Sequence, residues 1–148
     1  MASRIIYVPF DHLHREYGAL KNADTANDVI AMVESARMTS GRQWHPIRLH
    51  FLISSARHFA KSLQEEGFTV HYEKASSTID GLKKIQKLYP ESSVLCAEPS
   101  SFKQYEALKA FGVSFVPNDL FLTSRSDFAE WAGSQKSFLM ENFLCHGW

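Results

Sequence analysis

Short runs of apolar residues along the chain alternate with longer segments whose apolar residues recur at three- and four-residue steps. The short runs are rich in valine and isoleucine and carry no charge in their interiors. This pattern is typical of strands that are covered on both faces of a parallel sheet. Five such strands are predicted, at residues 4–10, 28–34, 68–72, 93–97 and 113–116.

The clearest helical pattern lies between the second and third predicted strands. Its apolar residues form one stripe, and charged residues such as Arg57 and Lys61 fall on the opposite face. Pro46 suits the first turn of this helix, and Gly67 suits its end. The stripe consists of Leu49, Leu52, Ile53, Ala56, Phe59, Ala60 and Leu63.

Three further helices are predicted, at 77–89, at 100–111 and from Ser124 onward, where Ser124 or Ser126 is the expected N-cap. Strands that alternate with helices imply right-handed crossovers. We therefore predict one Rossmann-like, doubly wound α/β domain over residues 1–148, with a five-stranded, mainly parallel sheet between two helical layers. In the helix at 77–89, the residues expected to face the sheet are Ile79, Leu82, Ile85 and Leu88.

The composition narrows the classes of function. Hydrophobic residues make up 45% of the chain and charged residues 22%, which is normal for a soluble globular domain. Sixteen basic residues balance sixteen acidic ones, so no long-range field attracts nucleic acid or an anionic membrane. No segment approaches the ~18 apolar residues of a membrane span, and the start shows no signal-peptide pattern. We expect a cytoplasmic protein.

Ligands of open α/β sheets bind beyond the carboxyl ends of the strands. Here these ends carry Asp11–His12, Glu98–Pro99, Asn118–Asp119 and a predicted long loop at 34–44. The loop mixes cations with flat or soft groups, which suits an aromatic heterocycle with polar edges; the alternative is a solvated loop whose Trp44 packs on the domain. Since no glycine-rich phosphate motif follows the first strand, NAD and ATP are disfavoured.

Other residues are of types used in metal binding or catalysis, but no further motif in the sequence supports such a site. The sequence Asp11-His12-Leu13-His14 contains metal-ligand types, although a loop with one helix-capping carboxylate fits it better. Glu34 and Glu98, at two strand ends taken to be neighbours, could pair for acid–base work or cap backbone amides. Cys145–His146 is discounted as a nucleophile and base, because adjacent residues seldom bring their side chains together. No catalytic residue is assigned.

Several segments resemble, in the same order, the N-terminal domain of the deoxyribodipyrimidine photolyase-related proteins, the bacterial photolyase and cryptochrome relatives that carry an iron–sulfur cluster. The most specific is Ser-Ser-Ala-Arg-His-Phe-Ala at 54–60, close to the family's Ser-Ala-Met-Arg-His-Phe-Ala. Phe-Asp-His-Leu at 10–13 stands where the family shows Gly-Asp-Gln-Leu. The other matching segments are 33–35 with 44–45, 98–99, 119–124, 128–132, and Lys136 with 140–143.

The resemblance implies the N-terminal, antenna-type domain of a protein associated with light-driven, flavin-dependent repair of DNA photoproducts or with light sensing. In relatives, FAD, the 4Fe-4S cluster and most of the DNA-binding surface belong to a larger helical domain. We expect this chain to lack that domain, to engage damaged DNA only together with it, and to be catalytically incompetent alone. Two cysteines cannot supply the four ligands of an ordinary cluster.

Relatives also hold an antenna chromophore, 6,7-dimethyl-8-ribityllumazine, at positions that match Asp11, Glu34, Met38 and Leu52. With Phe10 and Trp44, these residues form the cofactor pocket that we predict. Met38 stands where lumazine-binding relatives place a glutamate, and a methionine cannot accept the hydrogen bonds that the amide edge of a heterocycle requires. This difference favours another flat ligand stacked on Trp44 or Phe10 as an alternative.

Three other functions remain open from the sequence. The first is a stand-alone module for a small ligand or a protein partner, including a homodimer through exposed apolar residues near the C-terminus. The second is a small hydrolase or transferase that uses Asp11, Glu34 or Glu98. The third is direct binding of DNA through Arg37, Arg42 and Arg48. The residues expected on the apolar surface are Phe138, Leu139, Phe143 and Leu144.

Overall fold

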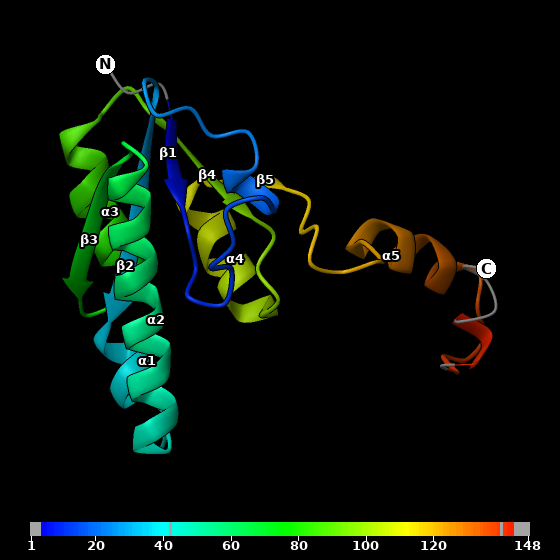
Figure 1. Cartoon of the computed structure of the whole chain (residues 1–148). Helices are drawn as coiled ribbons and strands as arrows, with labels where there is room; N and C mark the ends of the chain where they lie inside the picture. The colour runs from blue at the N-terminus through cyan, green and yellow to red at the C-terminus, as the bar shows by residue number, and fades with distance from the viewer. Residues whose placement is uncertain (1–3, 42, 140, 144–148) are drawn as a thin grey trace. The chain divides into compact units, whose positions relative to one another are not determined.

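Five parallel strands form a single sheet in the order β3-β2-β1-β4-β5, in a computed structural model that describes residues 4–41, 43–139 and 141–143 (Figure 1). The arrangement confirms the predicted Rossmann-like fold with a parallel sheet. The strands are β1 (Arg4–Tyr7), β2 (Asp28–Ser35), β3 (Thr69–Ala75), β4 (Ser93–Ala97) and β5 (Ser114–Val116).

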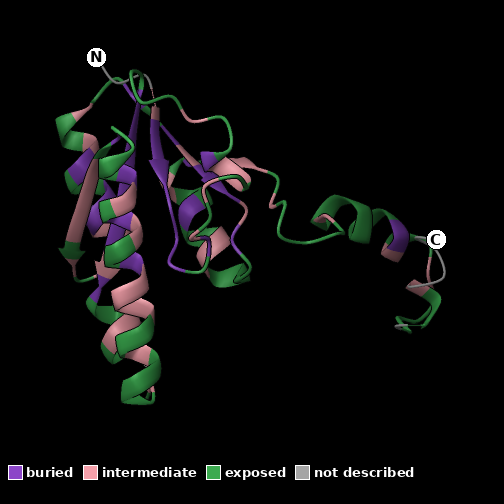
Figure 2. Ribbon diagram, viewed as in Figure 1, coloured by how far each residue is buried: buried purple, intermediate pink, exposed green. Residues whose placement is uncertain are grey.

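Helices cover both faces of the sheet, because successive residues of a buried strand point to opposite sides. Ile5 and Tyr7 of β1 pack in a cluster with α3 and α4, whereas Ile6 packs in a second cluster with α2. The central strands β1, β2 and β4 are mostly buried, as are the helix faces that meet them, whereas the edge strands β3 and β5 are intermediate or exposed (Figure 2). The helices are η1 (Gly18–Leu20), α1 (Ala36–Ser40), α2 (Pro46–Glu65), α3 (Thr78–Leu88), α4 (Phe102–Phe111) and α5 (Arg125–Gly133).

Serine side chains start most of these helices. Ser35, Ser77, Ser101 and Ser124 each accept a hydrogen bond from a backbone N–H of the first turn, and Ser124 completes a capping box. The longest helix, α2, begins at Pro46 without a side-chain cap. Asp11, the carboxylate after β1, caps none of the described helices, so its predicted capping role is wrong.

Two local predictions need correction. The segment 34–44, expected to be a long loop, contains α1, because Ser35 accepts a hydrogen bond from the Met38 amide and starts a short helix. Leu88, expected to face the sheet, is 61% exposed, because it lies in the last turn of α3 and the following Tyr89 packs against the core instead.

The strand order reverses once. The chain builds β1, β2 and β3 outward in one direction, and α3 then carries it back to place β4 on the other side of β1. The reversal point thus lies between the carboxyl ends of β1 and β4, which is the place where doubly wound sheets bind their ligands.

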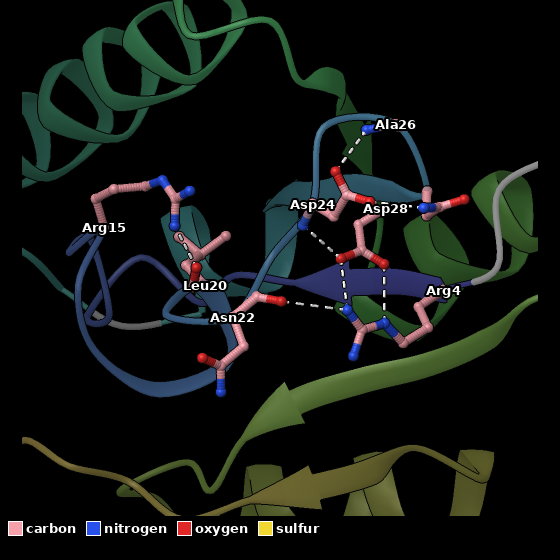
Figure 3. Close-up of polar contacts among 8 residues, drawn as sticks. Arg4, Arg15, Leu20, Asn22, Asp24, Ala26 and Asp28 are labelled. Atoms are coloured by element: carbon pink, nitrogen blue, oxygen red, sulfur yellow. Dashed lines mark hydrogen bonds and ion pairs between the residues drawn. The ribbon is translucent and has the colours of Figure 1, made fainter.

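At the amino edge of the sheet, a buried carboxylate ties the strands to the preceding loop (Figure 3). Asp28 is 2% exposed, and its two oxygens accept hydrogen bonds from Arg4 Nε at 2.8 Å and Arg4 Nη2 at 2.6 Å. The backbone N–H of Asp24 donates to the same carboxylate at 2.8 Å, and Asp24 in turn accepts from the amide of Ala26. This network fixes how β1 and β2 begin.

The sequence predicts one domain, and the contacts divide the chain into two compact units, Met1–Asn118 and Asp119–Trp148. The second unit contains α5, whose buried Trp131 packs against Phe128 and Phe143. Phe138 and Leu139 are exposed, as predicted, whereas Phe143 is half-buried, because its ring packs against Trp131. Leu144 lies outside the described residues. Within the described ranges, no helix is both long and apolar enough to span a bilayer.

Candidate functional site

Aromatic and polar side chains gather where β1, β2 and β3 end. The ring of Phe10, just after β1, stacks near that of Tyr72 of β3, with centroids 6.0 Å apart and an interplanar angle of 24°. The Tyr72 hydroxyl donates a hydrogen bond to Glu34 Oε2 at 2.8 Å. Met38 and Leu52 pack on the same apolar cluster as Phe10. The fold therefore brings together four predicted pocket residues, Phe10, Glu34, Met38 and Leu52.

The Glu34 carboxylate is also held by α2. Arg57 Nη2 donates to both of its oxygens, at 3.1 Å and 2.9 Å, and Arg57 Nε donates to Oε2 at 3.2 Å. Burial alone raises the pKa of Glu34, but the hydrogen bonds from Arg57 and Tyr72 outweigh it and hold the pKa below its usual value. Burial and the same hydrogen bond raise the pKa of Tyr72 to about 12. Glu34 is thus an ionised acceptor, and it is not a proton donor near neutral pH.

Trp44 lies between α1 and α2. Its Nε1 donates to the backbone oxygen of Met38 at 2.9 Å, and the Arg48 guanidinium lies 5.0 Å from its ring centroid. These contacts hold the half-buried indole against its own segment. Its ring N–H is therefore occupied within the chain.

A second group of polar residues lies where the strand order reverses. His12 is buried, and its Nε2 lies 3.2 Å from Asn118 Nδ2, which also donates to the backbone oxygen of Glu98 at 2.9 Å. Asp11, another predicted pocket residue, is exposed beside His12, with Oδ1 4.0 Å from Nε2. Burial lowers the pKa of His12, and the charge of Asp11 opposes this only in part. The imidazole is therefore neutral near pH 7.

Glu34 and Glu98, for which the sequence left an acid–base pair open, do not meet. Their strands, β2 and β4, lie on opposite sides of β1, and Glu34 is engaged by Arg57 and Tyr72. Nor does any group of three or more metal-ligand side chains occur among the described residues, the His-x-His segment included. Arg42, Cys145 and His146 lie outside that part of the chain.

The described residues suit one of the cofactors implied by the resemblance better than the other. Ring faces at Phe10 and Tyr72, with the carboxylates of Asp11 and Glu34, are groups that a flat heterocycle with polar edges requires. An iron–sulfur cluster is held by several cysteine thiolates, whereas the described ranges contain one free cysteine, Cys96, and burial raises the pKa of its thiol.

Sequence reasoning missed the role of Tyr72 and the tie between Arg57 and Glu34. Tyr72 was visible only as a member of a short strand, and its alternation with Val70 marked one face of the sheet. Arg57 was correctly placed on the polar side of α2, but nothing in the spacing showed that it reaches the end of β2.

Comparison with known proteins agrees with this architecture. A (6-4) photolyase of Agrobacterium fabrum (strain C58 / ATCC 33970) is 29% identical over 154 residues, an alignment that covers 95% of this chain and 30% of that protein. The chain thus spans less than a third of the length of this relative. The sequence profile of the family described as deoxyribodipyrimidine photo-lyase-related protein matches residues 6–146. The chain belongs to the deoxyribodipyrimidine photo-lyase-related protein family.

Proposed function

We propose that this chain is the antenna-type N-terminal unit of a photolyase-related flavoprotein that repairs DNA photoproducts or senses light. In this role it holds a flat heterocyclic chromophore, of the 6,7-dimethyl-8-ribityllumazine kind, at the carboxyl edge of its sheet. The flavin, the iron–sulfur cluster and the contacts with damaged DNA belong to a helical domain with which the unit works. The chain alone is not a repair enzyme.

The observation that carries this proposal is the cluster at the ends of β1, β2 and β3. Phe10 and Tyr72 supply aromatic surface, and Glu34 supplies an ionised acceptor next to them. Glu34 Oε2 accepts from both Arg57 and Tyr72, whereas Oε1 accepts from Arg57 Nη2. Since each carboxylate oxygen has about two lone pairs, Oε1 retains capacity for a hydrogen bond from a polar donor of the ligand, such as a ribityl O–H.

The absence of a glycine-rich turn after β1 favours the same class of ligand. Backbone amides can donate hydrogen bonds to a diphosphate only where glycines let the chain approach it closely. The chain instead continues from β1 into Pro9, Phe10 and Asp11, which offer a ring and a carboxylate. A planar guest without a diphosphate fits these groups.

Titration with 6,7-dimethyl-8-ribityllumazine tests the proposal. We expect saturable binding, detected by the fluorescence of the lumazine, and a loss of affinity of about tenfold or more in Glu34→Ala. Glu66→Ala, which removes a carboxylate paired with Arg15 far along the chain, is the matched control and is expected to bind normally. Absence of lumazine binding by the unsubstituted chain would contradict an antenna role. If FAD co-purified with this chain in the absence of a helical domain, the assignment of the flavin to that domain would be contradicted.

The second unit favours one further candidate, a surface for a protein partner or a second copy. Phe138 is 69% exposed and Leu139 is 54% exposed, and adjacent exposed apolar side chains often mark interfaces. Size-exclusion chromatography with light scattering distinguishes the outcomes. A dimer that Phe138→Ser converts to a monomer supports self-association, and a monomer at all concentrations argues against it.

A further inference from the structure

His12 lies at the reversal point of the sheet and is not among the residues assigned above to the pocket. His12 lies just after β1 in the sequence. Its hydrogen-bond partner, Asn118, lies just after β5, 106 residues further along the chain. The residue is only 8% exposed, so more than nine-tenths of it is buried. A polar ring in such a place needs hydrogen-bond partners, because desolvation of an unpaired group costs free energy.

The contacts of Asn118 determine the tautomer of the His12 ring. Asn118 Nδ2 lies 2.9 Å from the backbone oxygen of Glu98, which can only accept, so the amide nitrogen is correctly placed as the donor. The same nitrogen lies 3.2 Å from His12 Nε2, which must therefore be the acceptor. A neutral imidazole that accepts at Nε2 carries its proton on Nδ1. Burial, which lowers the pKa of His12, keeps the ring in this neutral state.

The Nδ1–H donor has no acceptor. Nδ1 is buried and has no hydrogen-bond partner among the described residues. Leaving a buried donor unpaired is costly, and a group in that condition in a native structure calls for a specific explanation. The place of this donor, at the end of the central strand where doubly wound sheets bind ligands, gives one.

We propose that His12 is a ligand-binding residue whose Nδ1–H donates to a carbonyl oxygen of the heterocycle bound at this edge, while the carboxylate of Asp11 accepts the neighbouring ring N–H. This inference rests on the proposed function and specifies which polar edge of the ligand His12 and Asp11 bind. A lactam or dione edge, with N–H beside C=O, presents both required groups. A metal ion does not fit, because Nδ1 holds a proton and Nε2 is already engaged by Asn118.

Nδ1 is covered in the described structure, so a ligand reaches it only after the side chains over the ring move. The backbone on either side is a tight turn of its own, with His12 N donating to the oxygen of Pro9 and His14 N donating to that of His12. We therefore expect association well below the diffusion limit, as is usual when binding requires a conformational change.

The test uses the whole chain with 6,7-dimethyl-8-ribityllumazine and riboflavin as probes, since both carry a dione edge. His12→Leu removes the donor, and His12→Gln restores one through its amide. We expect the affinity for the probes to fall about tenfold or more in His12→Leu and to recover in His12→Gln. His58→Leu, on the exposed face of α2, is the matched control and is expected to bind like the unsubstituted chain.

Two further readouts separate ligand binding from a structural role. Nitrogen NMR of labelled histidine is expected to show His12 protonated at Nδ1, with a resonance that shifts when a probe binds. The thermal midpoint of His12→Leu is expected to equal or exceed that of the unsubstituted chain, whereas loss of a structural histidine would lower it. A ring protonated at Nε2 overturns the inference without any ligand.

The remaining outcomes are also decisive. Equal probe affinity in His12→Leu and the unsubstituted chain overturns the role of His12 but leaves the antenna function standing. No binding of either probe to the unsubstituted chain, with no change in the His12 resonance, overturns both. Binding that depends on Glu34 and not on His12 places the ligand at the ends of β2 and β3 alone.

Discussion

At the amino edge of the sheet, the buried carboxylate of Asp28 accepts hydrogen bonds from Arg4 and from the backbone of Asp24. At the carboxyl edge, the buried imidazole of His12 keeps a ring N–H without an acceptor in the described chain. The first arrangement satisfies its buried groups and stabilises the fold. The second carries an energetic cost within the isolated chain, which is a common feature of sites built for a ligand.

Substitution of Asp28 by alanine is expected to give the largest effect. It leaves the Arg4 guanidinium and the Asp24 amide without the Asp28 carboxylate as acceptor. Because Asp28 is buried but the Arg4 side chain is 40% exposed and can be hydrated, we expect a loss of about 2–3 kcal/mol, below that of a fully buried ion pair. Urea unfolding followed by circular dichroism measures the loss. The control is Glu66→Ala at an exposed pair with Arg15, where we expect less than about 1 kcal/mol. Equal losses in the two variants would remove the contrast between the edges.

Gly81→Ala tests how closely α3 packs on β2, between the amino and carboxyl edges of the sheet. A Cβ at this position of α3 would lie 2.5 Å from Val33 Cγ1 of β2, so the helix must move away from the sheet. Overpacking costs about 1–3 kcal/mol and outweighs the gain in helix propensity, which is about 1 kcal/mol. We expect a net loss of about 1–2 kcal/mol in thermal or urea unfolding. Gly133→Ala meets no atom within 4 Å and is expected to be neutral or slightly stabilising.

At the carboxyl edge, Tyr72→Phe removes the hydroxyl that donates to Glu34 and is expected to cost about 1 kcal/mol near neutral pH. It also alters the alkaline limb of the stability profile. Because folding raises the pKa of Tyr72 from about 10 to about 12, its contribution is fully present below pH 10 and is lost as the pH rises through 12. Between pH 9 and 12, the free energy of unfolding should therefore fall less steeply with rising pH in the variant than in the unsubstituted chain. An unchanged slope would contradict the burial of this hydroxyl.

The smallest expected effect has the opposite sign. His12→Leu removes a buried donor that lacks an acceptor, and it also removes the hydrogen bond from Asn118 to Nε2. Because Asn118 keeps the backbone oxygen of Glu98 as an acceptor, we expect no net loss of stability and a gain of up to about 1 kcal/mol near neutral pH. Since folding lowers the pKa of His12, the unfolded chain binds its proton more readily, and stability falls as the pH drops below about 6.5. The variant should show less of this acid loss, measured by urea unfolding between pH 5 and 8, whereas His58→Leu should not.

The local structure followed from the sequence to a large extent. Alternating apolar runs and helical stripes identified all five strands and the helices α2 to α5, because burial on both faces of a sheet requires uninterrupted apolar strands. Short-range polar signals were informative as well, since Ser124 was named as a candidate cap and does cap α5. The short helix α1 was missed, because five residues give too little periodicity to recognise.

The predicted pocket was assembled only in part by the sequence. The rule that ligands lie at carboxyl ends of parallel strands pointed to the segment that contains Glu34 and Met38, whereas Phe10 and Leu52 were added by the comparison with the family's motifs; the fold brings all four to one edge. The same rule left open a pairing of Glu34 with Glu98, which the structure excludes, because the order of strands in the sheet is not specified by the spacing of residues along the chain.

The sequence by itself determined all five strands, the longer helices and most of their buried faces, since a repeat of two or of 3.6 residues is a local property. Only the tertiary structure decided which groups meet across the sheet: Arg57 with Glu34, and Asn118 with His12. The physical reason is that periodicity specifies the direction of a side chain relative to its own element. Its partner depends on strand order and crossover, which are set by the packing of the whole domain.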